Sequence, residues 1–168
     1  MIRKTLATLL TIAISVICNA QSENDPLDAF RNLAGSTWIS EGDQLGGHQG
    51  KTVKRMEWGL DSTIVKVKTY TTDPKTLTFG LRNEGIRAYN AATASWEFYE
   101  FDKFGGVTKG EVYAIGKSIY YEYPYGEYLL LDSWEYVSDD EYKYTVSSLE
   151  NGEIKQQFHQ GVFKRKVE

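Results

Sequence analysis

Apolar and polar residues alternate along most of the chain, in short segments that begin near Gly35. Tyr142, Tyr144 and Val146 occupy every second position, with polar residues between them. Segment 63–69 alternates valine with lysine in a similar way. A period of two with one polar face is typical of antiparallel strands whose sheet is covered on one side. The pattern therefore predicts an all-β protein.

Turn-forming pairs such as Asp73-Pro74 and Asn151-Gly152 separate these segments at short intervals. The segments are rich in Tyr, Val, Thr, Trp and Phe, which suit a pleated surface. Ten antiparallel strands with short links must protect their edges, so we expect a closed up-and-down barrel, with a two-sheet sandwich as the alternative. The predicted strands are residues 36–42, 51–59, 62–72, 77–89, 95–102, 106–115, 118–123, 127–137, 141–149 and 153–164.

One short helix is predicted before the first strand, over residues 24–33. Asp25 is suited to cap its N-terminus, and Pro26 is favoured in a first turn. Leu27 and Phe30 lie along one face at helical spacing. The fold class predicted from the sequence is thus an antiparallel barrel of about ten strands preceded by one short amphipathic helix.

The N-terminal segment has the features of an export signal. Two positive charges precede the apolar run 5–17, which is too short to span a bilayer, and a small residue ends the segment at Ala20. We therefore expect a signal peptide over 1–20, a single domain over 21–168 and a secreted or periplasmic location. Cys18 offers an alternative, lipid anchoring, although the bulky residue before it is unusual for a lipoprotein signal.

Charge and composition exclude several classes of function. The formal net charge is −4, and removal of the two basic residues of the signal makes it −6, which argues against a nucleic-acid-binding surface. Cys18 is the only cysteine, and the chain has two histidines. Thiol catalysis, cysteine-ligated zinc and three-histidine zinc sites are therefore excluded, and no metal is expected. No Gly-x-Ser-x-Gly hydrolase motif is present.

Three residues within predicted strands carry possible chemistry. Glu100 and Asp132, if both point inward, would form a pair suited to general acid–base catalysis. Strand alternation, however, directs about half of such acidic side chains to the outside of the barrel. His159 in the last strand is either an ordinary strand histidine or, if it points inward, an axial haem ligand. We expect no catalysis and no cofactor, with haem as the alternative.

Aromatic residues are abundant, with 12 tyrosines, 7 phenylalanines and 4 tryptophans. A ten-stranded barrel is wider than its side chains need to fill, since about eight strands already approach the limit for a solid interior. An aromatic, partly hydroxylated lining would suit an apolar molecule with a polar end. The candidate ligand-binding residues are Trp58, Trp96, Phe98, Tyr121, Trp134, Tyr136, Tyr144 and Phe158.

Leu33, Gly35 and Trp38 resemble the Leu-x-Gly-x-Trp opening of the calycin superfamily of lipocalins and fatty-acid-binding proteins, with one extra residue before Trp38. In that superfamily the first-strand tryptophan packs against a basic residue of the last strand. The resemblance therefore implies that Trp38 and Arg165 close the barrel. Segment 85–90 is similar to a Gly-x-x-x-Tyr-Asp hairpin found in uncharacterised bacterial lipocalin-like domains.

Nitrobindin-like haem barrels also have ten strands, and His159 resembles their late histidine. Their Gly-x-Trp-x-Gly-x-Gly opening is missing after Trp38. The expected function is thus binding of a small hydrophobic or amphipathic molecule in an aromatic-lined cavity, without nucleic acid and without a transmembrane helix in the mature chain. A haem barrel that uses His159 and a solid-core structural or interaction module are the alternatives.

Overall fold

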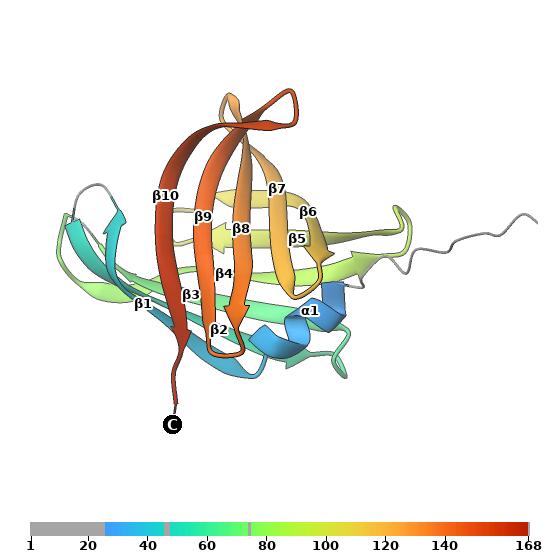
Figure 1. Ribbon diagram of the computed structural model, residues 1–168, viewed down its shortest axis with the longest axis horizontal. Coiled ribbons are helices and arrows are strands. Elements are labelled where there is room, and N and C mark those ends of the chain that lie inside the picture. Colours follow the sequence, from blue (N-terminus) through green and yellow to red (C-terminus); the bar gives the residue numbers. More distant parts are fainter. Residues whose placement is uncertain (1–25, 46–47, 74, 168) are drawn as a thin grey trace, which may run out of the picture.

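A computed structural model describes residues 26–45, 48–73 and 75–167, and the predicted signal 1–20, with Cys18, lies outside the described residues. The described part forms one helix and a closed antiparallel barrel of ten strands (Figure 1). The predicted barrel is confirmed, and the sandwich alternative is wrong. The elements are α1 (Pro26–Leu33), β1 (Ser36–Leu45), β2 (His48–Gly59), β3 (Ile64–Thr72), β4 (Phe79–Asn90), β5 (Ser95–Asp102), β6 (Val107–Ile115), β7 (Ser118–Tyr125), β8 (Tyr128–Ser138), β9 (Glu141–Glu150) and β10 (Glu153–Arg165).

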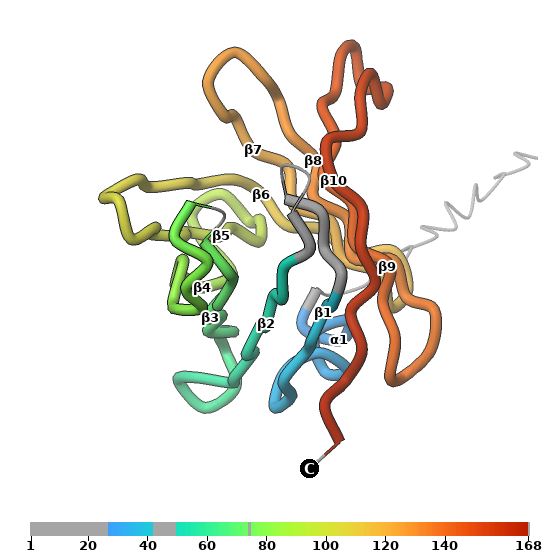
Figure 2. Tube along the Cα trace, turned by 90° about the vertical axis from the view of Figure 1, so that its left-hand side faces the viewer, coloured from blue at the N-terminus to red at the C-terminus, as the bar shows by residue number. Residues whose placement is uncertain are grey.

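Each strand pairs with its neighbours in the chain, and β1 also pairs with β10, which closes the barrel. The closing ladder is short: Trp38 pairs with Arg165, and Ile39 pairs with Lys164. Beyond these residues β1 turns away from β10 together with β2 (Figure 1). The β7–β8 and β9–β10 hairpins project side by side at the end of the barrel away from α1 (Figure 2).

The predicted strand limits differ most from the structure in the first hairpin. We expected a loop to separate strands at 36–42 and 51–59, but β1 extends to Leu45 and β2 begins at His48. Gln44 pairs with Gln49 in this extension. Pairing satisfies the backbone N–H and C=O groups of a hairpin even where the side chains show no apolar alternation, so the pattern missed these residues.

The hydrophobic core fills the half of the barrel next to α1. Phe30 and Leu33 of the helix are fully buried in it. Nε1 of Trp38 donates a hydrogen bond to the carbonyl of Leu33 at 3.0 Å, which attaches the helix to β1. Trp134 stacks on Phe163 with the ring centroids 4.8 Å apart. The helix and these rings together close one end of the barrel.

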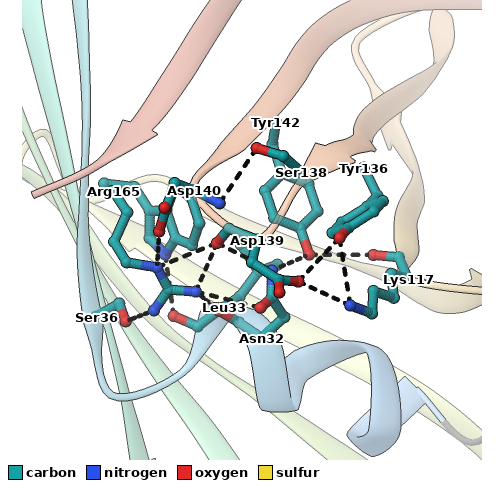
Figure 3. Close-up of polar contacts among 11 residues, drawn as sticks. Asn32, Leu33, Ser36, Lys117, Tyr136, Ser138, Asp139, Asp140, Tyr142 and Arg165 are labelled. Atoms are coloured by element: carbon teal, nitrogen blue, oxygen red, sulfur yellow. Dashed lines mark hydrogen bonds and ion pairs between the residues drawn. The ribbon is translucent and has the colours of Figure 1, made fainter.

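Arg165 joins the last strand to the helix and to the β8–β9 turn (Figure 3). Its guanidinium lies over the ring of Trp38, 4.7 Å from the centroid. Nη2 donates hydrogen bonds to the backbone carbonyls of Asn32 and Asp139, at 2.6 and 2.8 Å. Nη1 donates to the hydroxyl of Ser36. The two residues that the calycin resemblance implies for barrel closure are therefore in direct contact.

Candidate functional site

A cavity of about 390 Å³ lies in the half of the barrel away from α1. Every strand from β2 to β10 contributes to its wall. The alternation of each strand explains this arrangement, because inward residues near α1 form the core and inward residues further along surround the cavity. Among the candidate ligand-binding residues, those in the cavity wall are Phe98, Tyr121, Trp134, Tyr144 and Phe158.

The aromatic part of the wall consists of rings in contact with one another, some of them edge to face. Phe98 of β5 meets Tyr121 and Tyr123 of β7, with centroid distances of 5.3 and 5.4 Å and nearly perpendicular planes. Trp134 and Tyr144 lie 5.5 Å apart on β8 and β9. Such contacts hold the rings in fixed orientations. The cavity therefore has a rigid apolar surface on this side.

The other three candidates lie outside the cavity wall. Trp96 is buried in the core and packs near Tyr89, with the centroids 5.9 Å apart. Trp58 is half-buried against the same core. The Tyr136 hydroxyl donates a hydrogen bond to Asp139 at 2.8 Å, near the closed end of the barrel. Alternation predicts whether a side chain points inward, but not its height along the barrel axis, and these three are too close to the α1 end.

Arg87 enters the cavity from β4, and 5% of the residue is exposed. Its Nη2 donates to Glu100 Oε2 at 3.0 Å. Asn83 Nδ2 donates to the other carboxylate oxygen of Glu100 at 2.5 Å. Burial opposes ionisation of Glu100, but the charges of Arg87 and Lys54, together with these hydrogen bonds, outweigh burial and lower its pKa. Glu100 is thus held as a carboxylate inside the barrel.

Asp132 of β8 also faces the cavity, in a different environment. The hydroxyl of Tyr144 donates to its Oδ2 at 2.7 Å, and the hydroxyl of Tyr123 donates to its Oδ1 at 2.9 Å. Burial raises the pKa of Asp132, although the charge of Lys54 and the two hydrogen bonds act in the opposite direction. The ammonium group of Lys54 lies over the Tyr144 ring, 4.5 Å from its centroid.

Glu100 and Asp132 therefore both point into one cavity, as the acid–base hypothesis required. One carboxyl group has a lowered pKa and the other a raised pKa. Opposed shifts of this kind also occur in binding sites and ion-pair networks, so they do not by themselves indicate catalysis. A catalytic role for the pair stays a hypothesis.

His159 lies in the cavity wall next to Phe158, although consecutive strand residues normally point to opposite sides. The register between β10 and β9 shifts between Gln157 and His159, so a bulge turns both side chains toward the cavity. The His159 ring is 5.7 Å from that of Tyr144. Phe158 is 44% exposed and lies at the rim.

Sequence reasoning missed the basic residues and the threonines of the wall, among them Arg87, Lys54 and Thr69. Arg87 follows Ile86, and polarity alone would place the isoleucine inside. The structure reverses this, because Ile86 faces outward and Arg87 faces the cavity. The pairing of Arg87 with Phe98 could have shown it, since residues directly opposite in a hairpin share a face.

No protein-family model matches the sequence, and a search of curated proteins found no similar protein. In the described part of the chain, His, Cys, Asp and Glu side chains form no group of three or more that could hold a metal ion. The described helix is too short to span a membrane.

Proposed function

We propose that the barrel binds a small hydrophobic or amphipathic molecule in its cavity and has no chemistry of its own. The observation that carries the proposal is the cavity itself, about 390 Å³ with an aromatic wall. This volume is within the range of known small-molecule sites, which combine apolar surface with a few polar groups. The resemblance of the opening segment to lipocalins and fatty-acid-binding proteins supports the same proposal.

The charged and hydroxyl-bearing residues favour an amphipathic ligand over a purely apolar one. Arg87, Glu100 and Asp132 face the same space as Phe98 and Tyr121. An apolar molecule would displace water from these groups without replacing its hydrogen bonds, which is unfavourable. A molecule with one apolar and one polar part would satisfy both kinds of surface.

Titration with N-phenyl-1-naphthylamine, a neutral apolar dye whose fluorescence rises in apolar sites, tests the proposal. Thr69 is buried in the cavity wall, whereas its neighbour Lys68 is directed to the outer face, where it pairs with Glu84. We expect Thr69→Trp to abolish dye binding by filling the cavity and Lys68→Trp to preserve it. Equal binding by both variants, or failure of the wild-type protein to bind both this dye and its sulfonated analogue 8-anilino-1-naphthalenesulfonate, would contradict the proposal and favour a solid-core interaction module.

A second pair of variants covers the case in which Thr69→Trp does not fold. Phe98 lies in the cavity wall, whereas Phe101 of the same strand is 55% exposed on the outer face. We expect Phe98→Ala to weaken dye affinity several-fold and Phe101→Ala to leave it unchanged. Circular dichroism of each variant would verify that the barrel is intact.

The haem alternative depends on His159, which lines the cavity. The space in front of this histidine also contains Lys54, Arg87, Glu100 and Asp132, so its walls suit a large apolar macrocycle poorly. We expect no Soret band after addition of haem. A Soret band that His159→Ala removes would support the haem barrel instead.

We also propose that the protein is exported, because residues 1–20 have the charged, apolar and small-residue regions of a secretory signal. N-terminal sequencing of the protein from its own source would test this. The expected first residue is Gln21. A chain that begins with a lipid-modified Cys18 would instead establish the anchored alternative.

A further inference from the structure

We propose that the polar part of the ligand is an acidic group and that it binds Arg87 inside the barrel. This inference rests on the proposed function and gives the ligand a chemical class, an organic anion with an apolar body. Nη2 of Arg87 donates to Glu100, and, against the effect of burial, the neighbouring Tyr121 helps to raise the pKa of the guanidinium. Nε and Nη1 are nevertheless buried and have no acceptor with hydrogen-bond geometry among the described residues. A buried charged donor without an acceptor is costly, and an anionic oxygen is its strongest acceptor.

The residues around Arg87 restrict the position of its guanidinium group. Gly85, two residues earlier on β4, has no side chain, and a Cβ there would lie 3.1 Å from Nη1 of Arg87. The guanidinium therefore lies beside bare backbone, with the rings of Phe98 and Tyr121 at 5.4 and 5.1 Å from Cζ. Glu100, the ion-pair partner, is directly opposite Gly85 in the ladder. These neighbours leave Arg87 few alternative positions.

The charges around Arg87 are compatible with one additional negative charge. Glu100 balances Arg87 through an ion pair at 3.0 Å. Lys54, which also lines the cavity, adds a positive charge near Glu100 and Asp132. Burial favours the neutral form of Asp132. Arg82 and Asp102 also line the cavity, so its basic and acidic side chains are equal in number. The attraction for an anion therefore comes from the buried donors Nε and Nη1 of Arg87 rather than from a net charge of the wall.

Two dyes that share a ring system can distinguish the contribution of apolar contact to ligand affinity from the contribution of charge. N-phenyl-1-naphthylamine is neutral, and 8-anilino-1-naphthalenesulfonate carries a sulfonate on the same scaffold. We expect Arg87→Met to weaken binding of the sulfonate dye at least tenfold and binding of the neutral dye less than threefold. Arg55→Met is the matched control, because Arg55 is exposed and lies over Tyr70 outside the cavity. It should change neither affinity.

Glu100→Gln provides a second test that keeps Arg87 in place. The change removes the negative charge that competes with the ligand, while the amide can still accept a hydrogen bond from Arg87. We expect the sulfonate dye to bind several-fold more tightly, and the ratio of its affinity to that of the neutral dye to rise several-fold. If Arg87→Met weakens both dyes equally, or Glu100→Gln leaves the sulfonate dye unaffected, the assignment of the acidic group is wrong. If neither dye binds the wild-type protein, the proposed function itself fails.

Competition distinguishes the kinds of acid. Bound sulfonate dye would be displaced with 1-naphthoate, 1-naphthyl phosphate and uncharged 1-naphthol, which share one ring system. Both anions should displace the dye at concentrations at least tenfold lower than 1-naphthol does, and the stronger of them identifies carboxylate or phosphate as the preferred group. Equal displacement by 1-naphthol would overturn the inference.

Discussion

Replacement of Arg165 by methionine would test how the barrel is closed. Methionine has a similar length and keeps apolar contact with Trp38, but it removes the charge and every hydrogen-bond donor. The lost contacts include those to the Asn32 and Asp139 carbonyls at 2.6 and 2.8 Å, the ion pair with Asp140 at 3.1 Å and the cation–π contact at 4.7 Å. Because β1 and β10 share a short ladder, these contacts carry much of the closure.

The size of the effect follows from the burial of each contact. The cation–π contact contributes about 1 kcal/mol at a partly exposed site. The part-buried hydrogen bond from Arg165 to the Asn32 carbonyl contributes about 2 kcal/mol because the donor is charged. The ion pair with Asp140 adds little, since that carboxylate is exposed. We therefore expect the free energy of unfolding to fall by about 3 kcal/mol.

Urea denaturation followed by tryptophan fluorescence measures this change. With a slope of about 2 kcal/mol per molar urea, the midpoint of Arg165→Met should fall by about 1.5 M. Lys164→Met is the matched control, since Lys164 is 72% exposed and its nearest carboxylate oxygen is 3.8 Å away. Its midpoint should stay within about 0.3 M of wild type. A similarly small shift for Arg165→Met would refute the role of Arg165 in closure.

Three further substitutions test other parts of the structure. Hydrogen bonds from Tyr99 and Asn90 lower the pKa of Glu97 from 4.5 to about 2, so its contribution to stability is present above pH 4.5 and is lost as the pH falls toward 2. In thermal melts recorded over this pH range, the melting temperature of Glu97→Gln should therefore fall less steeply than that of the wild type. Glu57→Gln on β2 should keep the wild-type dependence on pH. A Cβ at Gly110 would lie 2.2 Å from the Glu122 carbonyl oxygen, whereas a Cβ at Gly80 would meet open space. In urea titrations Gly110→Ala should therefore lower the free energy of unfolding by about 1–3 kcal/mol, and Gly80→Ala should lower it by less than about 1 kcal/mol. Trp134 is 1% exposed, so Trp134→Ala should cost about 3–5 kcal/mol by the same measurement, and a cost below about 1 kcal/mol would contradict its place in the core.

The fold could be predicted from the sequence because its determinants are local. Alternation in segments such as 141–147 identified the strands, and pairs such as Asn151-Gly152 identified the turns. Closure followed from the need of ten short-linked strands to hide their edges. The extension of the first hairpin to Leu45 and His48 escaped prediction, because backbone pairing rather than side-chain pattern determines it.

The candidate site was less accessible to prediction, because its composition depends on height along the barrel and on strand phase. Trp96 and Tyr136 have the right residue type but lie nearer the closed end than the cavity. Phe158 and His159 share a face through a bulge that no residue pattern indicates. Arg87 breaks the expectation that the apolar member of a pair points inward, which is common where a polar residue has a functional reason to be buried.

Native mass spectrometry of the protein purified from its own source tests the central claim most directly. If the cavity carries a small molecule, the spectrum should show excess mass above the polypeptide, and this mass should leave on denaturation. We predict that the released compound is an organic acid with an apolar body. A bare polypeptide mass, together with failure of the purified protein to bind either naphthalene dye, would contradict the account.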